Sequence, residues 1–446
     1  MVTTNPASAT TGMRTTPAHP TEPAPNGEST GAHVGNGATG PAGAPAEPAP
    51  STARVPTPAI VHESRTWNQA VLIGIAAFIV SRLCLLAGAG VRAAQVTVDA
   101  AEELESSPGS PTSLVTGVFT QWDGRWYMEI VRNGYPRAIP PGVTFHQDEA
   151  RAAFFPVYPS LVRALDRIVP GGDTVVALGI NVILGVVGML LVGHLARRLY
   201  DNNVAERAMV LFAVFPGSFV LSMAYAEALL IVLAALCLWF LMDEKWLLAG
   251  IVAAVATATR PNGIALVGAC AVAAAIAIWR KRDWWSLVAP VLAPIGFVAF
   301  QLFLNAHTDE RWAWFRVQRE AWREGTSFGA TALSNTFSFF THPLASPTDA
   351  LTAVSMGALL LGLWCLYRKR LPWPMVAYIA VVVILMLVPA TVTARPRFLF
   401  TAFPLFISAA AWWPRRDRAL WDLMLVMCGA GLAGLTALYG VFGAIP

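Results

Sequence analysis

The chain has 446 residues, of which 55% are hydrophobic and only 13% carry a charged side chain. So few polar residues cannot cover the surface of a soluble protein of this length, and the composition therefore indicates a polytopic membrane protein. The net charge is only +4 and no basic stretch is interleaved with aromatic residues, which excludes a nucleic acid as partner.

Residues 1–60 consist mainly of Pro, Ala, Thr, Gly and Ser and contain few aliphatic side chains. Such a segment cannot bury enough apolar surface to offset the entropy of ordering, so we expect a disordered cytoplasmic tail. No charged segment followed by a short apolar core opens the chain, and we expect no cleavable signal peptide. The five cysteines lie far apart inside apolar runs, which predicts neither a disulfide framework nor a metal site.

A membrane-spanning helix needs roughly 20 apolar residues to cross about 30 Å of hydrocarbon. About eleven such runs follow the tail, and the sequence predicts an all-α polytopic integral membrane protein with about 11 transmembrane helices over residues 68–446. The stretch 154–169 is interrupted by charged residues and by Pro156 and Pro159, so we interpret it as an interfacial or re-entrant helix. The eleven runs begin near Gln69, Thr174, Ala208, Ala228, Trp246, Gly263, Trp285, Ala350, Trp373, Phe398 and Leu420.

Basic residues are concentrated in alternate connections between these runs, which the positive-inside rule assigns to the cytoplasm. With the tail inside, the cytoplasmic connections carry the clusters at 197–207, 280–282, 368–370 and 415–418, together with Lys245. The extracytoplasmic side receives a large first loop, about 92–172, and the segment of about 305–349. We therefore expect a multi-pass plasma membrane protein whose N-terminus is cytoplasmic.

Four polar motifs that are far apart in the sequence fall at the extracytoplasmic membrane edge in this topology. A charge in or beside the hydrocarbon costs about 2.5 to 3.5 kcal/mol, and such charges are functional candidates for that reason. One shared site is the simplest explanation of all four. The motifs are Trp122-Asp123, Tyr225-Ala226-Glu227, Arg260-Pro261-Asn262-Gly263 and Arg395-Pro396-Arg397.

Asp123 lies between Trp122 and the pair Trp126-Tyr127, aromatic residues typical of a membrane interface. A partly desolvated carboxylate suits a general base that takes a proton from a hydroxyl group. The alternative is that Asp123 only caps a surface helix, since Asp is a favoured N-cap residue. Further acid or base candidates in the same loop are Glu129, His146, Asp148 and Glu149.

The arginines at this edge suit an anionic group. Arg260 stands in a tight turn beside Pro261 and Gly263, and guanidinium groups such as those of Arg395 and Arg397 match phosphate oxygens bidentately. Contacts with lipid headgroups, or between Arg260 and Glu227, are the alternative. Glu227 itself could be a helix cap or a solvated turn residue. No divalent metal or other cofactor is required by this reasoning, although a metal is not excluded.

In their order along the chain, these motifs resemble those of the PIG-V-like mannosyltransferase family, and this chain is expected to be a bacterial member. The resemblance extends from about residue 68 to the C-terminus. It rests on Trp122-Asp123, Gly134-Tyr135, Ala153-Phe154-Phe155-Pro156 with Tyr158-Pro159, Phe215-Pro216-Gly217, Tyr225 with Glu227, Arg260 with Asn262-Gly263, and Arg397-Phe398 before Phe403-Pro404.

The resemblance implies a GT-C-type glycosyltransferase that takes mannose from a polyprenyl-phosphate carrier and transfers it, with inversion, to an extracytoplasmic lipid, glycan or protein. It implies that Asp123 is the catalytic residue. We expect Arg260, Arg395, Arg397, Glu227 and Asn262 to serve the donor phosphate and its sugar, and Trp122, Trp126, Tyr127, His146, Glu149 and Tyr225 to serve the acceptor and the loop. The alternatives are a transporter or flippase of lipid-linked sugars and a non-catalytic subunit of an envelope-glycan assembly.

Overall fold

The computed structural model describes residues 65–102, 110–343, 345–391, 393–414 and 418–441. Within these ranges every regular element is a helix, apart from an isolated bridge between Thr326 and Pro389. The expectation of an all-α membrane protein is confirmed. The predicted tail, residues 1–60, lies outside the described residues.

Six helical segments of the described chain are long and apolar enough to cross a membrane, and a bent pair would make a seventh. The six are α1 (Trp67–Glu102), α5 (Asp173–Leu199), η3 (Pro261–Ile264) with α9 (Ala265–Lys281), η4 (Trp284–Leu287) with α10 (Val288–Leu292) and α11 (Ile295–Thr308), α14 (Pro347–Arg368), and α18 (Arg418–Gly440). The bent pair is α6 (Asn202–Val214) with η2 (Pro216–Ser222).

Shorter apolar helices account for the remaining predicted runs. They are α7 (Glu227–Met242), α8 (Trp246–Thr257), α15 (Trp373–Leu387), α16 (Pro396–Thr401) and α17 (Pro404–Trp412). Each of the eleven apolar runs of the sequence is therefore helical, although by length alone only six or seven of the segments reach a full span. Proline divides two of the runs into pieces, because η2 begins at Pro216 after α6 and α17 begins at Pro404 after α16.

The remaining helices come from the two segments predicted to be extracytoplasmic. They are α2 (Pro111–Phe119), α3 (Asp123–Asn133), η1 (Asp148–Ala153), α4 (Val157–Asp166), α12 (Ala313–Ala321) and α13 (Ala330–Thr341). The helix α4 has 10 residues, about half of what a span needs, and buries Tyr158, Pro159 and Val162 on one face. It covers the stretch that the sequence marked as interfacial or re-entrant.

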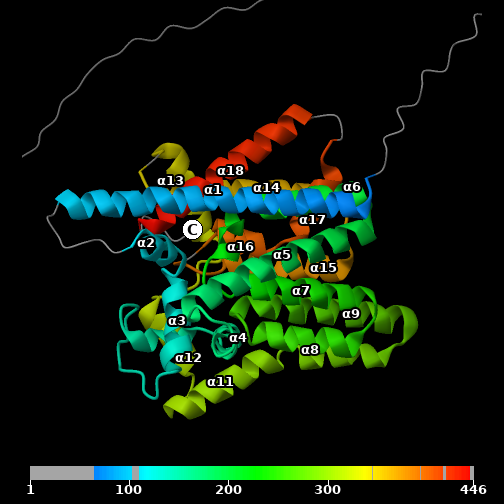
Figure 1. Cartoon of the computed structure of the whole chain (residues 1–446). Helices are drawn as coiled ribbons and strands as arrows, with labels where there is room; N and C mark the ends of the chain where they lie inside the picture. The colour runs from blue at the N-terminus through cyan, green and yellow to red at the C-terminus, as the bar shows by residue number, and fades with distance from the viewer. Residues whose placement is uncertain (1–64, 103–109, 344, 392, 415–417, 442–446) are drawn as a thin grey trace, which may run out of the picture. The chain divides into compact units, whose positions relative to one another are not determined.

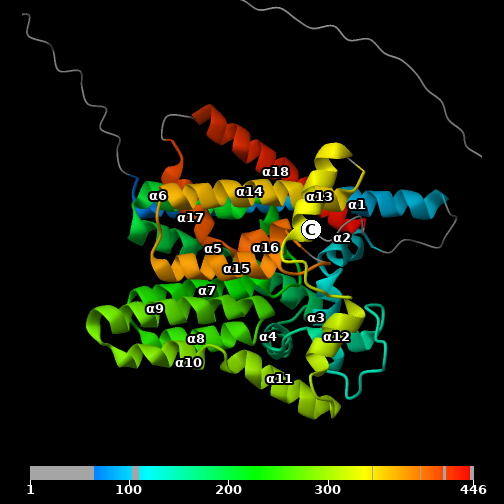
Figure 2. The ribbon, with the colours of Figure 1, turned by 180° about the vertical axis from the view of Figure 1, so that it is seen from behind.

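The long helices pack side by side in a bundle. The helix α1 packs against α18 and α6, α5 packs against α6 and α7, α7 packs against α8, and α9 packs against α15. Figures 1 and 2 show these helices running alongside one another, with α3, α4 and α12 gathered at one end of α7 and α8. That end of the bundle carries the candidate site.

The break between α6 and η2 bends the chain by 75°. A bend of this kind frees backbone and hydroxyl groups inside the bundle, which must be satisfied by neighbours. Arg82 of α1 does so, because its Nη1 atom donates to Ser218 O and Ser222 Oγ, both at 2.9 Å, and its Nη2 atom donates to Ser218 Oγ at 2.8 Å. Arg82 thus fastens the segment that leads to Glu227.

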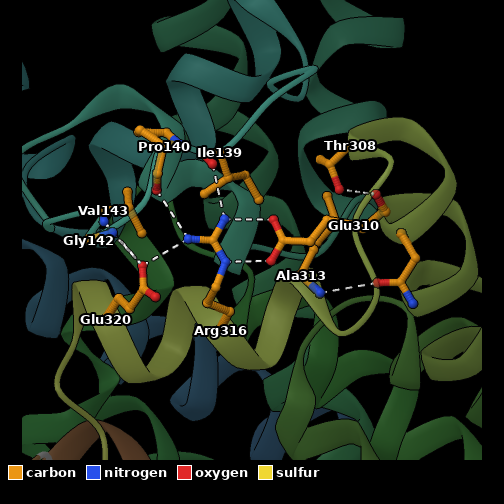
Figure 3. Close-up of polar contacts among 11 residues, drawn as sticks. Ile139, Pro140, Gly142, Val143, Thr308, Glu310, Ala313, Arg316 and Glu320 are labelled. Carbon is orange, nitrogen blue, oxygen red and sulfur yellow. Dashed lines mark hydrogen bonds and ion pairs between the residues drawn. The ribbon is translucent and has the colours of Figure 1, made fainter.

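Arg316 of α12 ties the two predicted outer segments together (Figure 3). Its guanidinium pairs with Glu310 and with Glu320 Oε2 at 2.9 Å, and it donates to the carbonyl oxygens of Ile139 and Pro140 at 3.0 and 3.1 Å. The hydrogen bonds with Glu310 raise the pKa of Arg316 above its ordinary value, so the Arg316 guanidinium keeps its positive charge. The loop after α3 is thereby held against α12 although the two are more than 170 residues apart.

Candidate active site

Asp123 is the first residue of α3 and follows a residue with an unusual backbone conformation. Trp122 has a φ of 53°, in the left-handed region that residues other than glycine rarely adopt. Its side chain is anchored, because Trp122 Nε1 donates to Tyr439 O at 3.3 Å. No side-chain cap bond is made at the start of α3; instead, Asp123 Oδ2 accepts a hydrogen bond from Arg397 Nη1 at 2.8 Å. Helix capping is therefore not what occupies the Asp123 carboxylate.

Two buried tyrosines hold the backbone around Asp123. The N–H of Asp123 donates to Tyr225 Oη at 3.3 Å, the hydroxyls of Tyr225 and Tyr439 lie 2.8 Å apart, and Tyr439 Oη donates to Gln121 O at 2.6 Å. Since a carbonyl only accepts, the Tyr439 proton points to Gln121, and the Tyr225 proton must point to Tyr439. Hydrogen bonds therefore link Asp123 through the two tyrosines to Gln121. This link holds the residues on both sides of Trp122, the residue with the strained backbone.

Glu227 begins α7 and is placed by a buried amide on α5. The Asn181 Nδ2 group donates to Tyr225 O at 2.8 Å, to Met223 O, and to Tyr158 Oη at 3.0 Å. These bonds satisfy the carbonyl groups of the turn between η2 and α7. The turn is thus a fixed part of the protein interior, and Glu227 is not the solvated residue that one reading of the sequence allowed.

The two arginines of the site are brought in by close backbone contacts. Arg260 is extended and directly precedes η3, where a Cβ on Gly263 would meet Ala256 O at 2.3 Å. Arg397 is the second residue of α16, where a Cβ on Gly217 of η2 would meet Pro396 O at 2.2 Å. At both places only glycine allows the neighbouring segments to approach this closely.

Asp123, Glu227, Arg260 and Arg397 form one group of alternating charge, which we call the ion cluster. Arg260 Nη1 lies 2.6 Å from Glu227 Oε2, and Arg260 Nη2 lies 3.9 Å from Asp123 Oδ2, the same oxygen that Arg397 contacts. The exposed fractions of the side chains are 1% for Glu227, 6% for Arg397, 10% for Arg260 and 16% for Asp123. Glu227 is therefore the most buried member of the cluster, and Asp123 is its most accessible member.

Several polar atoms of the ion cluster make no hydrogen bond within the described part of the chain. Among the buried side-chain atoms of the described residues, Arg260 Nε, Arg397 Nε and Glu227 Oε1 have no hydrogen-bond partner, and neither has Gln121 Oε1 next to the cluster. Buried polar groups of a native protein are normally paired. Guanidinium groups with an unpaired N–H donor can bind an anionic group such as phosphate when the side chain turns toward it.

Arg395 is bonded to α14, although its Nε atom, like those of Arg260 and Arg397, has no hydrogen-bond partner among the described residues. Its Nη1 atom donates to Thr348 O at 2.9 Å and to Thr352 Oγ1 at 3.2 Å, so its guanidinium fastens α16 to the first turns of α14. Arg397, two residues later, faces the site, and its guanidinium also stacks 4.8 Å from the Phe398 ring. The sequence placed both arginines at the same edge but did not distinguish these roles.

Tyr127 and Trp126 lie on the buried face of α3, where they form part of an aromatic core. The Tyr127 ring packs edge-on against Phe154 and Tyr158, and the Trp126 ring stacks on Phe154 with 6.5 Å between the ring centres. Burial raises the pKa of Tyr127 above its ordinary value, so its phenol stays protonated and does not act as a base. Both residues support α3 and thereby the position of Asp123.

The other sequence candidates lie further out. His146 is exposed, and its ring lies against that of Phe145 with 4.1 Å between the centres. Glu149 is half-buried in η1, and Asn262 is half-buried in η3, two residues after Arg260. For none of the three side chains does the described part of the structure show a hydrogen bond to the ion cluster.

Three contributors to the site were not found from the sequence, namely Gln121, Asn181 and Tyr439. Asn181 is a lone amide in the apolar α5, and such a residue in a span is a signal that could have been used. Tyr439 stands near the end of the last span, where a tyrosine is ordinary for a membrane interface. Among the described residues, no three His, Cys, Asp or Glu side chains are grouped so that they could hold a metal ion.

Comparison with known proteins gives one family match and several similar structures. Residues 153–308 match the family described as dolichyl-phosphate-mannose-protein mannosyltransferase. No curated protein matches the chain. The chain is similar to ArnT from Cupriavidus metallidurans bound to undecaprenyl phosphate, with 14% identity, coverage of 84% of this chain and 77% of ArnT, and a TM-score of 0.48.

Archaeal proteins of Archaeoglobus fulgidus are also similar. The oligosaccharyltransferase in its apo form shares 15% identity over 81% of this chain and 55% of its own, with a TM-score of 0.38. AglB in complex with an inhibitory peptide and a dolichol-phosphate shares 13% identity over 72% of this chain and 52% of its own, also with a TM-score of 0.38. The PIG-V-like resemblance stays a prediction. Over residues 153–308, which include Glu227 and Arg260, this multi-helix membrane protein is similar to the dolichyl-phosphate-mannose-protein mannosyltransferase family.

Proposed function

We propose that the protein is a membrane glycosyltransferase that transfers mannose from a polyprenyl-phosphate carrier to a hydroxyl group of an extracytoplasmic lipid, glycan or protein. The observation that carries this proposal is the ion cluster. Four segments of the chain bring two arginines and two carboxylates together, and the carboxylate of Asp123 is the most accessible of them. The family match over residues 153–308 supports a sugar on a lipid phosphate as donor.

The charges of the ion cluster balance before a donor binds, because Arg260 and Arg397 offset Glu227 and Asp123. A phosphodiester donor adds one negative charge. The guanidinium groups of Arg260 and Arg397, whose Nε atoms are buried without a partner among the described residues, then turn to contact its phosphate oxygens. As Arg397 turns toward the phosphate, its hold on Asp123 Oδ2 weakens, and the carboxylate becomes available to the acceptor. Donor binding thus frees the carboxylate of Asp123 to accept a proton from the acceptor hydroxyl.

In the transfer step, the acceptor oxygen forms a bond with the anomeric carbon of the sugar. The bond between that carbon and the phosphate oxygen breaks, and its electron pair stays on the phosphate. The acceptor proton goes to Asp123, which acts as general base. The phosphate gains one negative charge as Asp123 loses its own. The positive charge of Arg397 then stabilises the leaving phosphate as its second negative charge forms. One displacement of this kind inverts a β-linked mannosyl phosphate to an α-mannoside.

The surrounding residues position this machinery. Tyr225 and Tyr439 hold the backbone at Asp123, Asn181 holds the turn before Glu227, and Glu227 orients Arg260. Trp122 and the exposed His146, with Glu149 beside it, lie on the segment that faces the acceptor in this proposal. Arg395 acts only through the placement of α16.

The proposed setting follows the charge pattern of the connections. The N-terminus is cytoplasmic, the ion cluster faces the outside of the plasma membrane, and residues 68–446 form one catalytic domain of the GT-C type. The partners are the polyprenyl-phosphate sugar, the acceptor and the membrane lipids.

The test is sugar transfer by the purified protein in lipid vesicles. Radiolabelled polyprenyl-phosphomannose and an acceptor extract are supplied, and we expect labelled acceptor from the wild type. Asp123→Asn keeps the shape of the side chain but removes the base, so transfer should fall by about 10² to 10⁴-fold. Transfer of label at the wild-type rate by a folded Asp123→Asn variant would show that the base is assigned wrongly. Movement of the carrier across the vesicle without any transfer would favour a transporter.

A further inference from the structure

A cavity lies at the opposite end of the bundle from the ion cluster, where α14 ends and α15 begins. It is a groove of about 590 Å³, within the size range of small-molecule sites. The proposed sugar transfer does not use it. Its walls are Leu363, Leu366, Tyr367, Arg370, Leu371, Trp373 and Val376.

The direction of α14 fixes the distance of this groove from the ion cluster. The first turns of α14 contact Arg395, which is two residues from Arg397 of the cluster, whereas the groove lies at the last turns of α14. Twenty-two helical residues at 1.5 Å each separate the two ends of α14 by about 33 Å. That separation is close to the thickness of the hydrocarbon layer, so the groove opens at the other membrane surface. Figure 2 shows the connection between α14 and α15 at the end away from α3.

Exposed aromatic side chains mark this end as a membrane interface. Trp279, Trp284 and Trp285 are all largely exposed, and so are Tyr367 and Trp373 at the mouth of the groove. Aromatic residues of this kind gather at the level of lipid headgroups. The basic cluster 368–370 lies at the same level, on the side that the positive-inside rule assigns to the cytoplasm.

The groove combines an apolar wall with one cation. Leu363, Leu366 and Tyr367 are spaced three and four residues apart and therefore share one face of α14. Arg370 follows at the helix end, and its backbone is held because Tyr200 Oη donates to Arg370 O at 3.2 Å. Arg368 belongs to the same basic cluster but faces elsewhere, since its guanidinium lies 5.8 Å from the Trp364 ring. Arg370 is thus the cation that lines the groove.

A neighbouring cavity of about 360 Å³ shares Trp373 with the groove, but its charges differ. There Glu244 is among the lining residues and is paired with Lys281, and Arg280 lines the cavity as well. An anion has less reason to bind beside a carboxylate. The groove that carries Arg370 has no carboxylate among its described lining residues, which makes it the better match for an anionic group.

We propose that this groove is a binding site for one anionic phospholipid of the membrane. An acyl chain lies along Leu363, Leu366 and Val376, and the phosphodiester contacts the guanidinium of Arg370. The rings of Tyr367 and Trp373 flank the region between chain and headgroup. The ligand comes from the bilayer, and its recognition needs both an apolar chain and a negative charge.

The test compares two lipids with the same acyl chains, phosphatidylglycerol and phosphatidylcholine, bound to the purified full-length protein in detergent. Native mass spectrometry gives the affinity of each. We expect the wild type to prefer phosphatidylglycerol, and Arg370→Gln to bind it roughly fivefold more weakly, the share of one basic residue at an anionic lipid surface. Arg368→Gln removes the same charge two residues away and should keep the preference.

A groove-filling variant tests the apolar part separately. Leu366→Trp leaves every charge in place but occupies the groove, and we expect it to lose binding of both lipids while it elutes as a folded protein. Equal affinity of the wild type for the two lipids would overturn the proposal. So would equal losses in Arg370→Gln and Arg368→Gln, which would indicate a diffuse basic surface, or unchanged binding by Leu366→Trp.

Discussion

The buried ion pair between Glu227 and Arg260 allows the sharpest prediction about stability. Arg260 Nη1 and Glu227 Oε2 are 2.6 Å apart, and the two side chains are 10% and 1% exposed. Glu227→Gln keeps the shape of the side chain but removes its charge. In that variant the only carboxylate oxygen within 4 Å of the Arg260 guanidinium, among the described residues, is Asp123 Oδ2 at 3.9 Å.

Breaking a buried ion pair by removing one partner costs about 3 to 5 kcal/mol, because the other charge stays buried without compensation. Since Asp123 still offsets part of the charge of Arg260, we expect the lower end, about 3 kcal/mol. Arg260→Gln should cost a similar amount. The double variant removes both charges, so it should be less unstable than the sum of the single variants, with a coupling energy of about 2 kcal/mol or more.

The surface pair of Arg132 and Asp173 provides a matched control, because its N–O distance is also 2.6 Å but its side chains are 53% and 21% exposed. An exposed pair contributes about 0 to 1 kcal/mol. Both double-mutant cycles are measured by equilibrium unfolding in mixed micelles. If the coupling in the buried pair is no larger than in the exposed pair, burial does not strengthen the ion pair of Glu227 and Arg260, and the reasoning is incorrect.

Other parts of the structure give further expectations. Tyr439→Phe removes the donor to Gln121 O and the acceptor of the Tyr225 hydroxyl proton, which is worth about 1 to 3 kcal/mol, so sugar transfer should fall about tenfold or more while donor binding persists; an unchanged turnover number would remove Tyr439 from the positioning role. Gly217→Ala places a Cβ 2.2 Å from Pro396 O, and we expect a poor yield of folded protein on size-exclusion chromatography, whereas a normal yield would show that η2 and α16 can separate. In a cysteine-free background, Arg137→Cys should react with an impermeant thiol reagent from outside the cell and Lys369→Cys only from inside; the reverse pattern would invert the proposed topology.

Much of the site was predictable because its charges are unusual in an apolar chain. The positive-inside rule placed Asp123, Glu227, Arg260 and Arg397 at one membrane edge, and the structure brings these four side chains together. The helical runs were equally clear, because their apolar composition leaves no other fold for them.

What the sequence could not supply is the direction of individual side chains. Arg395 and Arg397 are alike in local pattern, but Arg395 bonds to α14 and Arg397 to Asp123, and only tertiary packing determines which one meets Asp123. Gln121 and Tyr439 were missed for a similar reason, since their contact joins residues more than 300 positions apart. His146 looked equivalent to other loop acids and bases, and the fold leaves it exposed.

The central claim is that Asp123 acts on the acceptor while the arginines act on the donor phosphate. The most direct measurement determines donor binding and sugar transfer on the same preparation of Asp123→Asn, with Arg260→Gln beside it. We expect Asp123→Asn to bind polyprenyl-phosphomannose at least as tightly as the wild type but to transfer about 10² to 10⁴-fold more slowly, and Arg260→Gln to lose donor binding. Loss of donor binding in Asp123→Asn with an unchanged rate at saturation would contradict the account.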